Sequence, residues 1–101
     1  MSVFEVARIA VKGGMETSFS EGMKSGAAII AEAPGCRSVQ VMQGVEDARD
    51  FVLVVGWNSI DDHQAFRDSP RLAEYRATVS EFLDGPPSVS HFEVRVDIPA
   101  G

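Results

Sequence analysis

The run "FVLVVGW", residues 51–57, constrains the fold of this chain more than any other stretch. In an extended strand, alternate side chains point to opposite faces of the sheet. Neither face of this strand is polar, because the alternating sets are Phe51, Leu53, Val55 and Trp57 on one side and Val52, Val54 and Gly56 on the other. A strand with two apolar faces belongs in a sheet that is covered on both sides.

Three further segments are predicted to be strands. Residues 3–12 are rich in β-branched side chains and stop at a pair of glycines, and residues 36–44 alternate in the same way. Residues 88–98 form the last predicted strand. Its alternation is clean, with Ser90, Phe92, Val94, Val96 and Ile98 on one face and Val89, His91, Glu93, Arg95 and Asp97 on the other.

Two stretches have helical periodicity. The first has one apolar stripe at three- and four-residue spacing and ends at the "APG" of residues 33–35. The members of that stripe are Met15, Phe19, Met23, Ala27 and Ile30. The second stretch is predicted in two pieces. Ser59 caps a short helix, with Asp62 three residues on, and Ser69 and Pro70 start a longer helix that ends at Gly85.

The order of these elements predicts the fold. Strand, helix, strand, strand, helix and strand in 101 residues indicate one α+β domain over residues 1–101, a ferredoxin-like βαββαβ unit with a four-stranded antiparallel sheet. Helices would cover one sheet face. The other face would expose large apolar side chains of residues 51–57, each worth about 1.5–3 kcal/mol when buried. We therefore infer a homodimer that packs sheet against sheet.

Charge and composition exclude several classes of partner. Nine basic residues against fifteen acidic ones give a net charge of −6, so the chain lacks the basic stripe that nucleic-acid or anionic-membrane binding requires. The chain has no apolar run of about 20 residues and its N-terminus does not follow the signal-peptide pattern. With a single cysteine, Cys36, we expect a cytoplasmic protein in which this residue packs at a strand start.

Three stretches resemble one known family. "EAPGCRSVQVMQ", "FVLVVGWNSIDDHQAFRDSPRLAEY" and "FLDGPPSVSHFEV" are similar to the antibiotic biosynthesis monooxygenase (ABM) domain family. The resemblance runs from about residue 3 to residue 96 and implies a dimeric α/β barrel, two ferredoxin-like units packed through their sheets. It also implies several possible functions: cofactor-free oxidation of anthrones or naphthacenones by O2, oxidation of small quinols, heme degradation, or small-ligand binding and stress roles without established chemistry.

The heme-degrading branch is not expected. The resemblance implies that this branch needs an asparagine, a tryptophan and a histidine ligand where this chain has Ala7, Phe66 and Arg76. Arg76 cannot bind iron, because a protonated guanidinium has no lone pair to donate. The chain also lacks metal-ligand spacing between its two histidines and has no glycine-rich phosphate loop. We therefore expect neither a metal nor a cofactor.

His63 is the leading candidate for chemistry. It falls at the fourth helical position after Ser59 and shares a helix face with Ile60 and Phe66, which would turn it toward a cavity between helices and sheet. A neutral imidazole there can take a proton from a phenol or an activated C–H and leave a carbanion that reacts with O2. The alternative is a structural histidine satisfied by backbone or water.

Four other residues are candidates for the same site. Tyr75 would hydrogen-bond a substrate oxygen, and Arg76 would stabilise a developing oxyanion. Trp57 and Phe66 would form an aromatic wall. The alternatives are a core tyrosine, a solvated arginine and a core tryptophan. His91 is expected on the dimer-facing side of the last strand, as an interface contact.

The sequence therefore predicts a cofactor-independent monooxygenase that oxidises a phenol, anthrone or quinol with O2. The alternative is a non-catalytic dimeric protein that binds a small hydrophobic ligand or has a stress role. An open cavity in which His63 and a second polar group converge favours the enzyme. A pocket filled by Phe and Met side chains, with His63 in solvent, favours the alternative.

Overall fold

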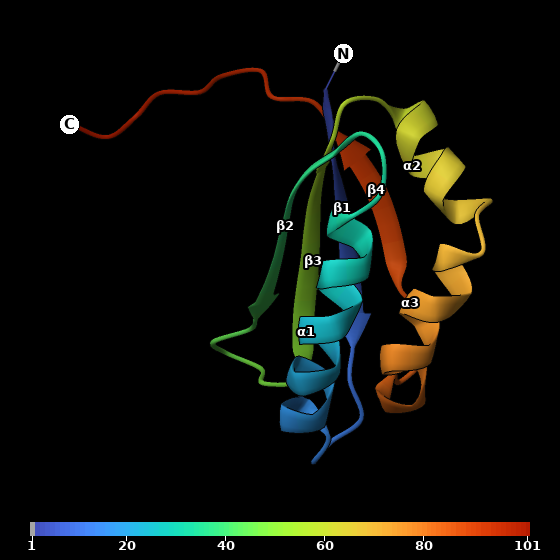
Figure 1. Cartoon of the computed structure of the whole chain (residues 1–101). Coiled ribbons are helices and arrows are strands. Elements are labelled where there is room, and N and C mark those ends of the chain that lie inside the picture. Colours follow the sequence, from blue (N-terminus) through green and yellow to red (C-terminus); the bar gives the residue numbers. More distant parts are fainter. Residues whose placement is uncertain (1) are drawn as a thin grey trace.

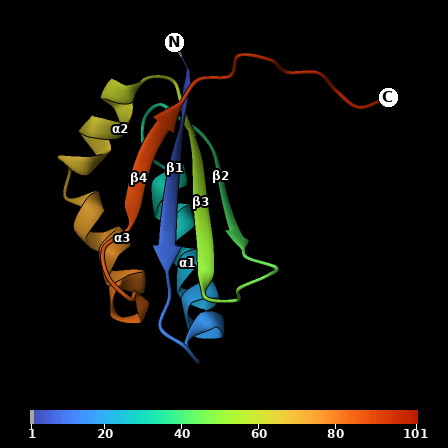
Figure 2. The same cartoon turned by 180° about the vertical axis from the view of Figure 1, so that it is seen from behind.

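The computed structural model describes residues 2–101, and it has the predicted ferredoxin-like architecture. The strands form one antiparallel sheet in the order β2-β3-β1-β4, with all helices on one face (Figure 1) and the other face open (Figure 2). The elements in chain order are β1 (Val3–Ala10), α1 (Glu16–Ala31), β2 (Cys36–Gln43), β3 (Asp50–Trp57), α2 (Ile60–Arg67), α3 (Arg71–Val79), the 3-10 turn η1 (Ser80–Phe82) and β4 (Ser88–Phe92). Among these helices none has the length and apolar character that crossing a bilayer requires.

The core lies between the sheet and the helices. β3 is paired on both sides, with β1 and β2, and its helix-facing residues Phe51, Leu53, Val55 and Trp57 are buried as expected. Its opposite face carries Val52 and Val54, which are only half-buried. β3 is thus apolar on both faces, and within residues 2–101 only its helix-facing side has a covering layer.

Two glycines set the distance between α1 and α3. Phe19, Met23 and Ile30 of the predicted stripe are buried, but Met15 is exposed and Ala27 is half-buried. Gly26 is buried because α3 crosses α1 there, and a Cβ at this position would lie 2.7 Å from Thr78 Oγ1 and 3.2 Å from the Tyr75 ring. At Gly22, one turn earlier, a Cβ would lie closer still to the Thr78 carbonyl oxygen. This close approach places Tyr75 against the core.

The start of α2 aims His63 inward. The Ser59 hydroxyl accepts a hydrogen bond from the backbone N–H of Asp62 at 3.2 Å, which confirms the predicted cap. His63 and Phe66 are buried, whereas Ile60 is exposed, so the expectation that all three share the inner face is wrong for Ile60. The inward face of this short helix is narrower than the sequence pattern suggested.

β4 is shorter than predicted. It pairs only with β1, and its last pair joins Phe4 to Phe92, next to the residue where β1 begins. β1 therefore offers no partner to the predicted second half of the strand. Residues 93–101 leave the sheet and run away from the domain (Figures 1 and 2), with Val94, Val96 and Ile98 exposed.

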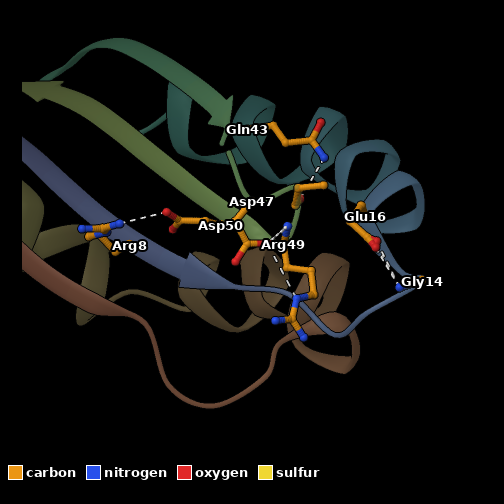
Figure 3. Close-up of polar contacts among 8 residues, drawn as sticks. Arg8, Gly14, Glu16, Gln43, Asp47, Arg49 and Asp50 are labelled. Carbon is orange, nitrogen blue, oxygen red and sulfur yellow. Dashed lines mark hydrogen bonds and ion pairs between the residues drawn. The ribbon is translucent and has the colours of Figure 1, made fainter. Parts of the chain in front are cut away.

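Polar contacts gather at the Ala10/Asp50 end of the sheet (Figure 3). Arg8 of β1 and Asp50 of β3 form an exposed ion pair at 2.9 Å. Gln43, the last residue of β2, donates to the Ala48 carbonyl in the loop between β2 and β3 at 2.8 Å. Exposed pairs of this kind contribute little to stability, about 0–1 kcal/mol each. These contacts order the loop, and the buried polar residues lie nearer the opposite end.

Candidate functional site

A cavity of about 290 Å³ opens between the sheet and helices α2 and α3. Its size is near the lower end of ligand pockets, about 300–1,000 Å³. Apolar side chains such as Phe66, Leu72 and Val89 form much of its wall. The ionisable residues of the wall are Glu5, His63, Arg67, Tyr75 and Arg76. The cavity thus brings together four predicted site residues, His63, Phe66, Tyr75 and Arg76, with Glu5 and Arg67, which the sequence analysis did not single out.

Glu5 is the buried acid of the site. Alternation in β1 turns Val3, Glu5 and Ala7 toward the helices, and Glu5 is only 7% exposed. The indole Nε1–H of Trp57 donates to Glu5 Oε1 at 3.0 Å. The same oxygen lies 3.2 Å from His63 Nε2. Buried polar groups need such partners, and here each partner comes from a different element.

His91 completes the cluster from β4. It is the register partner of Glu5, and its Nε2 lies 2.7 Å from His63 Nδ1, so one nitrogen donates and the other accepts. The prediction that His91 is on the dimer-facing side is therefore wrong. The alternation was read correctly, but the more apolar face of β4, which carries Phe92, is the exposed outer face.

Trp57 lies behind His63 and not on the cavity wall. The two rings stack with centroids 5.2 Å apart and an interplanar angle of 16°. Trp57 is fully buried and is not among the residues that line the cavity, so the expected aromatic wall consists of Phe66 alone. The indole instead fixes the plane of the imidazole and holds Glu5 by its N–H.

Burial shifts the pKa of both acid–base groups. It raises the pKa of Glu5, although the Trp57 hydrogen bond and the positive charges of His91 and Arg67 oppose the rise. Burial lowers the pKa of His63 to about 4, and the charges of His91 and Arg67 act in the same direction. The pKa of His63 is thus well below the ordinary histidine value of 6.5. His63 is a neutral imidazole at neutral pH and does not hold a proton readily on its own.

Tyr75 and Arg76 supply hydrogen-bond donors from α3. Burial raises the pKa of Tyr75 to about 12, the negative charge of Glu5 adds to the rise, and Arg76 opposes it. The Tyr75 hydroxyl therefore stays protonated at neutral pH and can donate to a ligand oxygen. Arg76 is exposed and lines the same cavity, where its permanent charge can stabilise an oxyanion.

The sequence analysis did not assign Glu5, His91 or Arg67 to the site. Glu5 had a usable signal, because it lies between the inward residues Val3 and Ala7 of β1 and a charged residue on a buried face needs a partner. His91 was seen but assigned to the wrong face. Arg67 follows Phe66 on α2 and carries no pattern that separates it from a solvated residue.

Burial raises the pKa of the Cys36 thiol, so it stays protonated and fits its predicted packing role. Within residues 2–101 no three His, Cys, Asp or Glu side chains are arranged to hold a metal ion. The facing nitrogens of His63 and His91 are in hydrogen-bond contact and leave no room for an ion between them.

The sequence profile described as antibiotic biosynthesis monooxygenase (ABM) matches residues 2–78. The chain belongs to this family. Among its relatives is the uncharacterised Bacillus subtilis protein YczJ, 29% identical over 92 residues that cover 90% of this chain and 97% of YczJ. This ABM chain also resembles a Bordetella bronchiseptica crystal structure that is provisionally named an antibiotic biosynthesis monooxygenase. The two are 31% identical with a TM-score of 0.90, and the match covers 94% of this chain and 98% of the Bordetella chain.

A more distant ABM structure shares the fold. SnoaB of Streptomyces nogalater, described as a cofactor-independent oxygenase, superposes with a TM-score of 0.85 over 98% of both chains at 18% identity. At that identity the similarity establishes the common ferredoxin-like architecture alone.

Proposed function

We propose that this ABM chain is a cofactor-independent monooxygenase that oxidises a small aromatic phenol, anthrone or quinol with O2. One observation carries the proposal: two buried acid–base groups, Glu5 and His63, meet at 3.2 Å on the wall of an open cavity. Perturbed titratable groups that converge in a cavity are typical of active sites. The proposal draws further support from family membership and from the similarity to SnoaB, a protein described as a cofactor-independent oxygenase.

The chemistry requires a base and a place for negative charge. For a substrate with an activated CH2 group, the base removes one proton and leaves a carbanion conjugated with the ring oxygen. The carbanion gives its electrons to O2, a C–O bond forms and a proton completes a hydroperoxide. Loss of water then leaves a C=O group. One oxygen atom ends in the product and the other in water, and the substrate supplies all four electrons, so the reaction needs no cofactor.

The residues divide this work by position. The Glu5–His63 pair accepts the proton, since His63 is neutral at neutral pH and Glu5 is a stronger base than an ordinary carboxylate. Tyr75 donates a hydrogen bond to the substrate oxygen, and Arg76 stabilises the enolate or phenolate charge. Phe66 provides an apolar wall for a planar ring, and Trp57 holds the base in place.

The alternative of a non-catalytic ligand-binding protein is less well supported. It requires a cavity filled by apolar side chains with His63 in solvent. Here His63 is 5% exposed and lines an open cavity beside a second polar group, Glu5. Ligand binding without turnover is therefore an outcome of the test and not a second proposal.

The test is oxygen uptake by the purified protein without added cofactor. Anthrone-type and reduced-quinone substrates are offered to the wild type, to His63→Ala and to Gln64→Ala, an exposed neighbour on α2. We expect uptake by the wild type and by the Gln64 variant, and a loss of about tenfold or more in the His63 variant. Binding of the aromatic without any uptake in the wild type would contradict the enzyme and favour the ligand-binding alternative.

We also propose that the chain forms a homodimer through the open face of the sheet. That face carries the half-buried Val52 and Val54 and the exposed Met42 and Phe92. Contiguous apolar surface of this kind marks an interaction site, and a second copy offers the same apolar face in return. A solution mass of about twice 10.9 kDa at low micromolar concentration is expected, and a mass of 10.9 kDa would contradict the dimer.

A further inference from the structure

We propose that Glu5, His63 and His91 form a proton relay that carries the proton taken from the substrate out of the main cavity to a second cavity beside His91. The source of that proton rests on the proposed function. The relay itself is a property of the three side chains, which are joined by contacts of 3.2 Å and 2.7 Å.

The second cavity supplies the exit. It measures about 360 Å³ and lies where the start of α2 meets the end of β4, lined among others by His91, Asp61 and Glu93. Glu5 and His63 line the main cavity and His91 lines the second. The contact between the two imidazoles therefore connects two cavities that otherwise have no lining residue in common.

The relay uses two proton arrangements, and the Glu5 carboxyl turns toward His63 Nε2 in both, because their 3.2 Å contact is not an aligned hydrogen bond in the structure. In the first, a protonated Glu5 donates to His63 Nε2, and His63 Nδ1–H donates to His91 Nε2. In the second, Glu5 is a carboxylate that accepts from His63 Nε2–H, and His63 Nδ1 accepts from the Nε2–H of an imidazolium His91. Two protons shift by one bond each between these states, and the net result moves one proton from Glu5 to His91. His91 then releases it to water from Nδ1.

The surrounding charges favour movement in this direction. Arg67 of α2 lines the main cavity, where its positive charge lowers the pKa of both Glu5 and His63, and the Tyr75 hydroxyl there stays neutral. The second cavity is lined by the carboxylates of Asp61 of α2 and Glu93 after β4, so the proton moves from a basic to an acidic lining. His63 lies between them, and its burial makes it a residue that passes a proton on without storing it.

The first test needs no turnover. The imidazole 15N chemical shifts of His63 and His91 are followed by NMR as the pH is lowered from neutrality. The relay predicts that, as the cluster takes up a proton, His63 shows averaged shifts of its Nδ1–H and Nε2–H tautomers while it stays neutral. In Glu5→Gln, whose amide cannot exchange a proton in this way, His63 should hold one tautomer. A single His63 tautomer throughout the wild-type titration would overturn the relay.

The second test uses the reaction. His91→Gln retains a hydrogen bond to His63 but cannot pass a proton, and His91→Ala leaves space for an added base. We expect kcat for oxygen uptake to fall by about tenfold or more in both variants with KM unchanged, and added imidazole to restore His91→Ala but not Glu5→Gln. A wild-type kcat in His91→Gln, or no rescue by imidazole, would overturn the relay. If the wild type consumes no oxygen, the proposed function fails, whereas the tautomer result still decides the relay.

Discussion

Glu5 Oε1 lies 3.2 Å from His63 Nε2, and both side chains are more than nine-tenths buried. A buried acid–base pair of this kind lowers stability unless its geometry is well satisfied, and it is weak evidence for a purely structural role. Here the Trp57 N–H donates a hydrogen bond to Glu5, and the His91 imidazole shares one with His63. The pair is thus held by side chains from two neighbouring strands, β3 and β4, in a position where it borders the cavity.

The lowered pKa of His63 predicts a specific loss of stability in acid. The pKa of His63 is about 4 in the folded protein, against 6.5 for the free side chain. Between these two pH values the unfolded chain binds a proton at His63 and the folded chain does not. The stabilising contribution is complete above pH 6.5 and is lost as the pH falls through the folded pKa, to a total of about 3 kcal/mol. Urea unfolding at pH 7 and pH 4 should show that His63→Gln removes this part of the acid dependence. Equal acid dependence in variant and wild type would contradict the assignment.

Removing the indole donor should destabilise the fold and raise the pKa of Glu5 further. Trp57→Phe deletes the indole N–H, which donates to Glu5 Oε1 at 3.0 Å and lowers the pKa of Glu5. Without this hydrogen bond the charged form of Glu5 is less stable. We expect a loss of about 1–3 kcal/mol in the free energy of unfolding. The carboxyl 13C shift of Glu5 should titrate at higher pH in the variant. A lower titration midpoint would show that the indole does not support the carboxylate.

The glycine contact between α1 and α3 should be sensitive to one methyl group. Gly26→Ala adds a Cβ that would lie 2.7 Å from Thr78 Oγ1 and 3.2 Å from the Tyr75 ring. Overpacking of this kind costs about 1–3 kcal/mol, more than the gain of up to about 1 kcal/mol from helix propensity. Ser25→Ala, on the exposed face of the same helix, serves as the control and should be neutral or stabilising. Thermal unfolding that ranks Gly26→Ala above the wild type would contradict the packing.

A charge on the open sheet face should break the proposed dimer. Val54 lies at the centre of that face, paired with Val6 on β1 and Gln40 on β2. Val54→Asp would bury an unpaired carboxylate in the interface, whereas Ala65→Asp places the same charge on the exposed side of α2. Light scattering should give 10.9 kDa for the first variant and twice that for the second. An unchanged mass in Val54→Asp would place any interface elsewhere.

The fold was predictable from the sequence because its strongest signals are local. Two-faced apolarity defined β3, Ser59 capped α2, and the glycine and proline stops separated the elements. The length of β4 was not predictable in this way, since it is set by where β1 begins to pair. Periodicity predicts which residues alternate, but the length of the strand depends on how many of them find a partner on the neighbouring strand.

The site was only half predictable, for a related reason. His63, Phe66, Tyr75 and Arg76 lie on the predicted helices and line one cavity, and their roles stay predictions. Glu5 and His91 belong to strands β1 and β4, and only the register that makes them neighbours reveals the cluster. His91 was assigned to the wrong face because apolarity normally marks the core, whereas in this chain the outer face of β4 is also apolar.

Oxygen consumption by Glu5→Gln tests the central claim most directly. Glutamine keeps the shape of Glu5 and can still accept the Trp57 hydrogen bond, but it cannot take a proton. With an anthrone or reduced quinone and labelled O2, the account predicts that the wild type places one labelled atom in the product, and that Glu5→Gln is slower by about tenfold or more. Equal rates for the two proteins would contradict the role of the Glu5–His63 pair as the base.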